Sequence, residues 1–418
     1  MLLRDAEGRA RLGGVLLEAI ARRGDVPTPF YAYDLDAMVD EAVDLARGFA
    51  GRDHLVCYAV KANSAGRLVR RLARAGVGAD VVSAGELEVC LGAGVPPERI
   101  VWSGVAKTET ELDRALAAGI LSVHAESVEE LARLDARARA VGKRAAVSLR
   151  INPGVEADTH ANIATGHDEA KFGVPLADVP HALAEVERSS SLSLVGLSAH
   201  VGSQMVRVDE YVRAAEVTAG LARELGSRGR ALSLLDLGGG MGVDYGEGCP
   251  VRPRAFVEAA ARAVAAIVDV PRLLCEPGRA IVAAHGVLVT RVVQTKRWSG
   301  RDTAGWVFLD AGMNDLARPA MYGARHRVEP LAPSASPLAC ARVGGPVCES
   351  SDDFGTYELP WPPPDLMMIR DAGAYGFTMA SQYNGRALPA EVFVEGGEVT
   401  GVSRGPDAAE WARARLAT

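Results

Sequence analysis

A single lysine ends one apolar run of this chain, at a position where its amine could do chemistry. The run spans about residues 54–60, Lys61 follows it, and the small residues Ala62 and Asn63 come next. This pattern is typical of a buried strand whose last residue projects into a cavity. An amine held there loses hydration and its pKa falls, so it becomes a nucleophile toward aldehydes. A strand that simply surfaces at a lysine has the same pattern, so other motifs must decide.

A glycine triplet follows another apolar run. Gly238, Gly239 and Gly240 come after Asp236-Leu237, and Gly242 is close behind. Glycines at such a place let backbone N–H groups approach a phosphate, although a flexible turn has the same composition. Because no Lys-Ser/Thr pair follows and the spacing is not G-x-G-x-x-G, neither a Walker loop nor a dinucleotide fingerprint is predicted.

Three further runs end in residues that would suit an aromatic, phosphorylated cofactor. Glu276 follows an apolar run and could keep a pyridine nitrogen protonated, which turns pyridoxal phosphate into an electron sink. Arg279 offers a planar fork for a carboxylate, although the two residues could equally form a surface ion pair. His200 could stack on a ring, and Ser203 could donate to a phosphate. His124 also ends a run, and we assign it a structural role.

The elements that must position these residues alternate regularly along the chain. Strands are predicted at about 54–60, 78–82, 100–102, 120–124, 145–151, 194–199, 232–236 and 272–275, and helices at about 66–75, 85–93, 109–118, 127–141, 178–188, 209–226 and 254–268. Eight such strands predict a parallel (β/α)₈ TIM-type barrel. A doubly wound open sheet shows the same alternation, but the strand count favours the barrel. Chemistry in such a barrel sits at the C-terminal ends of the strands, where Lys61 and Asp80 would meet the residues above.

Three domains are predicted. Residues 1–33 form an N-terminal arm that packs with the last domain, 34–275 form the barrel, and 276–418 form a mostly antiparallel β-domain rich in Gly and Pro. Asp34 is predicted to cap the first helix, whose apolar face begins at Leu35. An insertion is expected around Asn152–Gly173.

Composition excludes several classes of protein. The 418 residues carry a net charge of −7 and no Lys/Arg block, which argues against a nucleic-acid binder. No run approaches the roughly 18 apolar residues that a membrane span requires, and the N-terminus does not look like a signal peptide. The six cysteines form no C-x-x-C pair, so we expect a cytoplasmic protein without a metal site.

Taken together, the motifs resemble the alanine-racemase-like, fold-type III pyridoxal-phosphate decarboxylases, and most closely the diaminopimelate decarboxylases. The matching stretches follow the family's order over nearly the whole chain: YAVKAN (58–63), DVVSAGEL (80–87), INPGVEADTHANIATGHDEAKFGV (151–174), HVGSQ (200–204), LDLGGGMG (235–242), EPGR (276–279), DAGMNDLARPAMYGARH (310–326), GGPVCESSDDFG (344–355) and GAYGFTMASQYNGRALPAEVFV (373–394).

The resemblance implies a site for pyridoxal 5′-phosphate, which Lys61 would bind as an internal aldimine. It implies that His200 stacks on the cofactor ring and that Glu276 pairs with the pyridine nitrogen. The other implied cofactor-binding residues are Asp80, Ser203, Gly239, Gly240, Gly278, Arg279 and Tyr375.

The resemblance also implies a substrate and a partner. The implied reaction is decarboxylation of meso-2,6-diaminopimelate to L-lysine and CO₂. Cys348, supplied by the partner subunit, would protonate Cα, so the implied assembly is a homodimer with shared active sites. Two arginines and a glutamate suit a substrate whose far end carries both a carboxylate and an ammonium group. The implied substrate-binding residues are Arg279, Arg318, Tyr322, Glu349 and Tyr375.

Alternatives stay open on substrate and reaction. Gly385 and Leu388 depart from the residues common in the family, which are Ser and Arg. These departures are also expected in a decarboxylase of the same class that acts on another amino acid or on a carrier-bound group. An amino-acid racemase of this fold would use a tyrosine base and an arginine against the pyridine nitrogen, where this chain has Glu276. A non-enzymatic cofactor-binding module would consist of the barrel alone.

Overall fold

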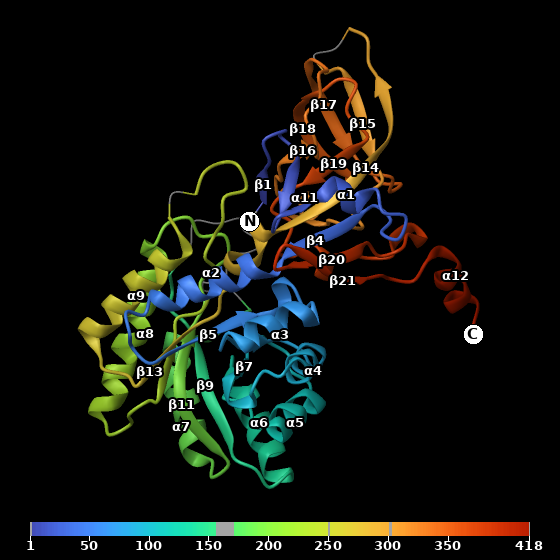
Figure 1. Cartoon of the computed structure of the whole chain (residues 1–418). Coiled ribbons are helices and arrows are strands. Elements are labelled where there is room, and N and C mark those ends of the chain that lie inside the picture. The colour runs from blue at the N-terminus through green and yellow to red at the C-terminus, as the bar shows by residue number, and fades with distance from the viewer. Residues whose placement is uncertain (1, 156–170, 250, 301–302, 418) are drawn as a thin grey trace. The chain divides into compact units, whose positions relative to one another are not determined.

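The computed structural model describes residues 2–155, 171–249, 251–300 and 303–417, and most of the predicted insertion around Asn152–Gly173 lies outside them (Figure 1). The chain forms two compact units. The first comprises Met1–Met38, Asp244–Gly248 and Val282–Thr418, and the second comprises Val39–Val243 and Cys249–Ile281. The three predicted domain boundaries stay a prediction.

The second unit is a closed parallel barrel, as predicted. Its strands are β5 (His54–Ala59), β6 (Gly78–Val81), β7 (Ile100–Trp102), β8 (Ser122–Ala125), β9 (Ala145–Asn152), β11 (Leu192–Ala199), β12 (Leu234–Asp236) and β13 (Arg272–Cys275). Neighbours pair in parallel in the order β9-β11-β12-β13-β5-β6-β7-β8, and a further pairing of β8 with β9 closes the ring. This closure excludes the doubly wound open sheet. The short β10 (Val174–Pro175) adds to β9.

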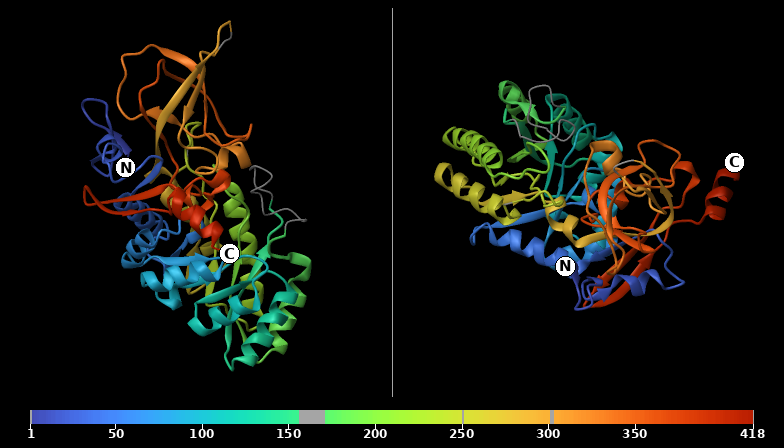
Figure 2. Two further views of the ribbon diagram at one scale, coloured as in Figure 1. Left: turned by 90° about the vertical axis from the view of Figure 1, so that its right-hand side faces the viewer. Right: turned by 90° about the horizontal axis from the view of Figure 1, so that it is seen from above.

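Helices follow the barrel strands and lie outside them (Figures 1 and 2). They are α3 (Gly66–Arg74), α4 (Ala84–Ala93), α5 (Glu109–Ala118), α6 (Val128–Ala140), α7 (Val179–Arg188), α8 (Asp209–Ser227) and α9 (Pro253–Ile267). Their starts follow from local chemistry: Ser83, Thr108 and Ser127 each accept a hydrogen bond from the backbone of the first turn. Inside the barrel, Leu55 and Cys57 of β5 pack with Val101, Leu234 and Leu274.

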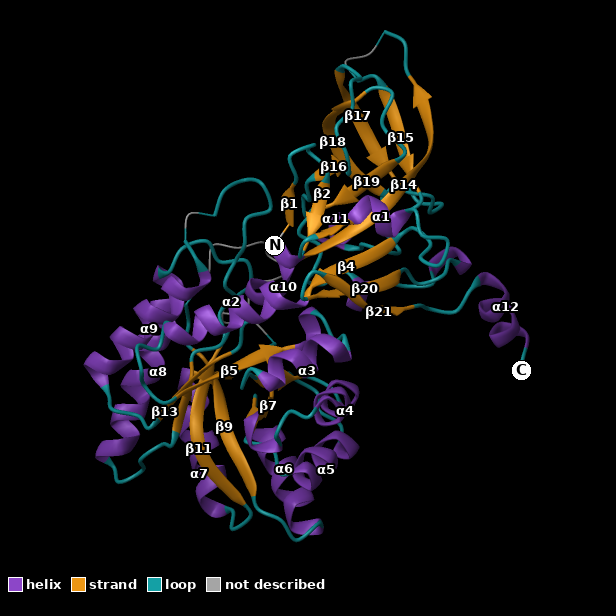
Figure 3. Cartoon of the chain, viewed as in Figure 1, coloured by secondary structure: helices purple, strands orange, loops and turns teal. Residues whose placement is uncertain are grey.

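The first unit is built on a mixed, mostly antiparallel sheet (Figure 3). Its strands are β4 (Phe30–Asp34), β14 (Gly286–Arg297), β15 (Gly305–Leu309), β16 (Val328–Pro330), β17 (Leu338–Gly344), β18 (Asp353–Pro360), β19 (Leu366–Ile369), β20 (Ala390–Glu395) and β21 (Glu398–Ser403). They pair in the order β18-β17-β15-β14-β4-β20-β21, with β19 joining β14 to β16. Only β15–β17 and β20–β4 are parallel among these pairs of the described residues.

The N-terminal segment is part of this sheet unit. Strand β4 pairs with β14 and β20, and its Phe30 packs in a core with Val287 and Val392. Strands β1 (Leu2–Arg4), β2 (Ala10–Leu12) and β3 (Val15–Leu16) form a small sheet of their own, followed by α1 (Leu17–Ala21). The predicted cap is present: Asp34 accepts a hydrogen bond from the N–H of Ala37 at the start of α2 (Leu35–Arg47).

The first unit also contains the short helix α11 (Arg318–Tyr322) and the helix α12 (Ala408–Leu416). The short helix α10 (Arg279–Val282) lies mostly in the second unit. None of the helices in the described part of the chain is both long and apolar enough to cross a membrane.

Candidate active site

Lys61 lies at the C-terminal end of β5, but not as the last residue of the strand. The strand ends at Ala59, and Lys61 sits in the 3₁₀ helix η1 (Val60–Ala62). The backbone turns because the N–H of Asn63 bonds to the carbonyl of Val60, which a continuing strand would not allow. The side chain of Lys61 is 40% exposed, and its Nζ lies 3.4 Å from Oδ2 of Asp80 in β6.

A buried hydrogen-bonded cluster surrounds Glu276 at the same ends of the barrel strands. The hydroxyl of Ser103 donates to Oε1 of Glu276 at 3.0 Å and lies 3.1 Å from Nδ1 of His124. The same nitrogen of His124 lies 3.4 Å from Glu276. Asp236 lies on the other side of the imidazole, 4.0 Å from Nε2. The ligand atoms of His124, Asp236 and Glu276 lie within 4.8 Å of one another, close enough to hold a cation as well.

The environment moves the pKa values of the three carboxyl groups in opposite directions. Burial alone would raise the pKa of Glu276, but the hydrogen bond and charge of His124, aided by Lys61, hold it below its usual range. Burial and the negative charge of Glu276 raise the pKa of Asp236 well above its usual value. Burial and Glu276 also raise the pKa of Asp80, against the opposing charge of Lys61. Glu276 is therefore the carboxylate of this cluster that stays ionised.

His200 follows β11 and lies beside the glycine triplet. Its Nδ1 accepts a hydrogen bond of 3.1 Å from the N–H of Gly239. Burial, followed by the charges of Arg150 and Lys61, lowers the pKa of His200 to about 3. The ring is therefore neutral near pH 7, and its proton is on Nε2.

The glycines are required by close backbone approaches. A Cβ atom on Gly239 would lie 2.0 Å from the carbonyl oxygen of Glu276, and one on Gly240 would lie 2.1 Å from that of Gly202. Gly240 also has a φ of +94°, which side chains disfavour. The triplet thus brings the loops that follow β11, β12 and β13 together without intervening side chains. Gly278 belongs to the same packing, since its Cβ would lie 3.0 Å from the Cβ of Ala62.

Two further predicted residues of the barrel, Arg279 and Ser203, contact each other. A guanidinium nitrogen of Arg279, which is buried, donates to the hydroxyl oxygen of Ser203 at 3.0 Å. Because that oxygen accepts from Arg279, the hydroxyl hydrogen of Ser203 is left to donate to another group.

The predicted substrate residues other than Arg279 lie in the first unit. Arg318 is buried at the start of α11, and Tyr322 ends the same helix. Cys348 and Glu349 are exposed in the turn between β17 and β18. Tyr375 follows β19 with a φ of +55°, a conformation that non-glycine residues adopt rarely and mostly where the surroundings enforce it.

Two residues that sequence reasoning missed hold the Cys348-Glu349 turn. The N–H of Cys348 donates to Oδ1 of Asn384 at 2.8 Å, and the hydroxyl of Tyr383 donates to the carboxylate of Glu349. Both come from η7 (Tyr383–Gly385), the stretch that departs from the family pattern at Gly385. The clustering of polar residues in this stretch is the only signal that the sequence offered.

Sequence reasoning also missed polar residues of the barrel. His124 was predicted to be structural, whereas it contacts Glu276 directly. Ser103 donates to the same carboxylate. Arg150 forms a buried ion pair of 2.8 Å with Glu126, and its charge lowers the pKa of His200. These residues lie at or close to the C-terminal ends of β7, β8 and β9.

Comparison with known proteins agrees with this geometry. Residues 36–283 match the family model described as "Pyridoxal-dependent decarboxylase, pyridoxal binding domain". A protein of Zymomonas mobilis named diaminopimelate decarboxylase is 42% identical over 376 residues, which cover 88% of each chain. One of Pseudomonas aeruginosa with the same name is 40% identical over 402 residues, covering 96% of this chain and 95% of the relative.

Solved structures give the same result. The crystal structure of diaminopimelate decarboxylase from Helicobacter pylori complexed with L-lysine has a TM-score of 0.88 at 36% identity, and the match covers 96% of this chain and 100% of that one. The cofactor of the matching family is pyridoxal phosphate, and its substrates are amino acids. The chain belongs to the pyridoxal-phosphate-dependent decarboxylases.

Proposed function

We propose that this enzyme decarboxylates meso-2,6-diaminopimelate to L-lysine and CO₂. The observation that carries the proposal is the 42% and 40% identity to proteins named diaminopimelate decarboxylase, over 88% and 96% of this chain. The reaction would supply the last step of lysine biosynthesis.

The barrel residues fit pyridoxal phosphate in the chemistry of their donors and acceptors. They offer an amine at Lys61, an ionised carboxylate at Glu276, a neutral imidazole at His200 and a hydroxyl donor at Ser203. The buried Oδ1 of Asp80 has no hydrogen-bond partner among the described residues, as expected of a site shaped for a further polar group. When bound, pyridoxal phosphate supplies an electron sink for the charge that departing CO₂ leaves behind.

The chain's own residues would divide this work. Lys61 would bind the aldehyde of the cofactor through its amine and later release the product. Glu276, held ionised by His124, would accept a hydrogen bond from the pyridine N–H and keep that proton in place. His200 would stack on the ring without adding charge. Ser203, Gly239, Gly240 and Tyr375 would hold the phosphate and its surroundings.

Arg279 and residues of the first unit would recognise the substrate. Arg318 would bind the distal carboxylate of diaminopimelate as a planar fork, with Arg279 and Tyr322 as further contacts. Glu349 would pair with the distal ammonium group, and the hydroxyl of Tyr383 orients its carboxylate.

The proton for Cα would come from a second subunit. We assign it to the thiol of Cys348 of the partner, which makes a homodimer the smallest active form. Cys348 is exposed, as a residue that acts in a neighbouring subunit must be when one chain is considered alone.

A substrate panel tests the proposal. The enzyme loaded with pyridoxal phosphate is assayed for CO₂ release with meso-diaminopimelate, L-lysine, L-ornithine and L-arginine at equal concentrations. We expect turnover of meso-diaminopimelate and a kcat/KM at least about 100-fold lower for the other three, because each of them lacks the distal carboxylate that a buried arginine would bind. Turnover of another amino acid without turnover of diaminopimelate would overturn the substrate while leaving the reaction class intact.

A further inference from the structure

The guanidinium of Arg318 is held between two rings. Its Nη1 lies 2.8 Å from Nε2 of His326, and its Cζ lies 4.7 Å from the centroid of the Tyr245 ring. The two rings also touch each other edge to face, with centroids 5.1 Å apart at 73°. Arg318 and His326 are both buried, and Tyr245 is half-buried.

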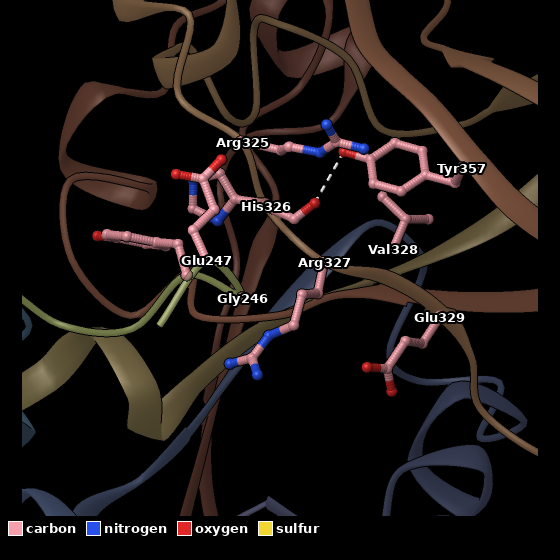
Figure 4. A pocket seen from close by; sticks show the side chains of 9 residues that line it. Gly246, Glu247, Arg325, His326, Arg327, Val328, Glu329 and Tyr357 are labelled. Carbon is pink, nitrogen blue, oxygen red and sulfur yellow. Dashed lines mark hydrogen bonds between the residues drawn. The ribbon is translucent and has the colours of Figure 1, made fainter. Parts of the chain in front are cut away.

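The hydrogen bonds fix the protonation of His326. A guanidinium can only donate, so Nε2 of His326 accepts from Arg318 and carries no proton. The proton is therefore on Nδ1, which lies 2.9 Å from the carbonyl oxygen of Arg370 and donates to it. The hydroxyl of Tyr357 also donates to the backbone carbonyl of His326 at 2.7 Å (Figure 4). Hydrogen bonds therefore hold His326 at both ring nitrogens and at its backbone carbonyl.

Neither ring cancels the charge of Arg318, because the imidazole is neutral in this tautomer and the phenol ring is uncharged. The neighbouring Arg327 differs, since its guanidinium makes hydrogen bonds of 2.9 and 2.6 Å to the carboxylate of Asp371. His326, Tyr245 and Arg327 line one cavity of about 400 Å³ (Figure 4). His326 and Tyr245 therefore line this cavity and also contact Arg318, whereas Arg327 of the same lining is paired with a carboxylate.

We propose that His326 and Tyr245 are positioning residues that present Arg318 for an anionic group of the substrate. This inference rests on the proposed role of Arg318. His326 sets the direction of the guanidinium through Nε2, and Tyr245 holds its face by a cation–π contact. A pre-oriented arginine loses less conformational freedom when a carboxylate binds, so the affinity for the distal carboxylate depends on both rings.

Substitutions of His326 that keep or remove the acceptor test the proposal. His326→Phe keeps an aromatic ring but has no acceptor for Arg318. His326→Gln places an amide oxygen near the position of Nε2 and restores the acceptor. With meso-diaminopimelate as substrate, we expect His326→Phe to raise KM about 10-fold, as for loss of a hydrogen bond to a charged group, with little change in kcat. His326→Gln should recover most of that loss. The matched control is His181→Phe, which makes the same change at an exposed histidine of the barrel and should leave KM unchanged.

A second variant keeps the test valid if His326→Phe does not fold. Tyr245→Leu removes the ring from beside the guanidinium and should raise KM about 3-fold, the size of a partly exposed cation–π contact. Cofactor absorbance and the thermal unfolding midpoint of each variant show whether the fold and the cofactor site are intact.

The double variant Arg318→Ala/His326→Phe separates this inference from the proposed function. If His326 acts through Arg318, the double variant should have the KM of Arg318→Ala alone. Additive losses would mean that His326 acts independently and would overturn the inference. A raised KM in Arg318→Ala with an unchanged KM in both His326→Phe and Tyr245→Leu would overturn the inference and leave the role of Arg318 standing. An unchanged KM in Arg318→Ala would overturn that role and the inference with it.

Discussion

The backbone N–H of Gly239 donates a hydrogen bond of 3.1 Å to Nδ1 of His200. This one contact joins the loop after β12 to the end of β11 and fixes the tautomer of the imidazole. Because a protonated Nδ1 could not accept it, the contact and the positive charges of Arg150 and Lys61 all oppose protonation of the ring. A histidine held neutral in this way can lie over a cationic cofactor ring without electrostatic repulsion.

The neutral state of His200 predicts a pH dependence of stability. Its folded pKa of about 3 lies below the ordinary value of 6.5. Between these two pH values the unfolded chain binds a proton at this residue and the folded chain does not, so the free energy of unfolding falls as the pH is lowered through this window. In His200→Phe this contribution is absent, and the loss of stability between pH 7 and pH 5 should be smaller.

Urea unfolding of the cofactor-loaded enzyme at pH 7 and pH 5 measures this difference. His181→Phe, which removes an exposed histidine of α7, is the matched control and should behave as the wild type does. An equal or larger loss in His200→Phe would show that His200 is not held neutral.

Lys61 is predicted to attach the cofactor. Lys61→Ala should lose the visible absorbance of the enzyme-bound cofactor and at least about 100-fold of the decarboxylation rate, because no other amine would replace its nucleophilic and proton-transfer roles. Spectra and CO₂ release are recorded at saturating pyridoxal phosphate. Lys296→Ala, which changes an exposed lysine of β14, should keep both properties. A Lys61→Ala enzyme with the wild-type spectrum would contradict the assignment.

The sequence predicted the barrel well because its signals are local. Each strand is a short apolar run, each helix has a capping residue or an apolar face, and the turns carry glycines. The rule that chemistry lies at the C-terminal strand ends then selected Lys61, Asp80, His200 and Glu276, which the structure brings to one end of the barrel. Apart from strand bounds that differ by one or two residues, the local error concerns Lys61, which lies in a 3₁₀ turn because the N–H of Asn63 bonds to the carbonyl of Val60.

The contacts that tune the site could not be predicted in the same way, because they join distant residues. The bond from Ser103 to Glu276 spans 173 positions, and that from Tyr383 to Glu349 spans 34. The spacing of a serine or a histidine in the sequence does not identify the residue to which its side chain will bond. His124 was therefore assigned a structural role, although its hydrogen bond and charge, with Lys61 and His200, lower the pKa of Glu276 against the effect of burial.

The opposite pKa shifts of Glu276 and Asp236 predict opposite responses to amide substitution. Glu276→Gln removes the ionised carboxylate and should lower kcat by roughly 100-fold or more, the size expected when one electrostatic contact to the reacting group is lost. Burial and the charge of Glu276 raise the pKa of Asp236, so the amide of Asp236→Asn changes the charge of the site less than that of Glu276→Gln. Its Oδ1 can still accept from the N–H of Gly238. We expect a decrease of less than about 10-fold for this variant.

Steady-state kinetics near pH 7, with cofactor binding measured separately, compares the two variants. An equal decrease in kcat for the two variants would mean that the reaction needs both carboxyl groups in the ionised form. That outcome would contradict the opposite pKa shifts of Glu276 and Asp236.

The proposed sharing of active sites between subunits predicts complementation between inactive variants. Lys61→Ala and Cys348→Ala should each be inactive as pure dimers. In a mixed dimer, one site combines the intact Lys61 of one subunit with the intact Cys348 of the other, while the second site lacks both. Random pairing makes half of the dimers mixed, so the mixture should reach about one quarter of the wild-type specific activity, as two-fold symmetry requires.

A second mixture gives the matched control for this experiment. Lys61 and Glu276 both belong to the barrel, so each of them serves the site of its own subunit. In a mixed dimer of Lys61→Ala and Glu276→Gln, every site therefore carries one of the two changes, and activity should not return. The two variants are co-expressed with different affinity tags, so that mixed dimers can be purified and assayed directly. Restored activity in the first mixture but not in the second would locate Cys348 in the neighbouring subunit's site. Because the tags select dimers that contain both variants, a lack of recovery could not be explained by missing mixed dimers. It would mean that Cys348 serves the site of its own chain, or none.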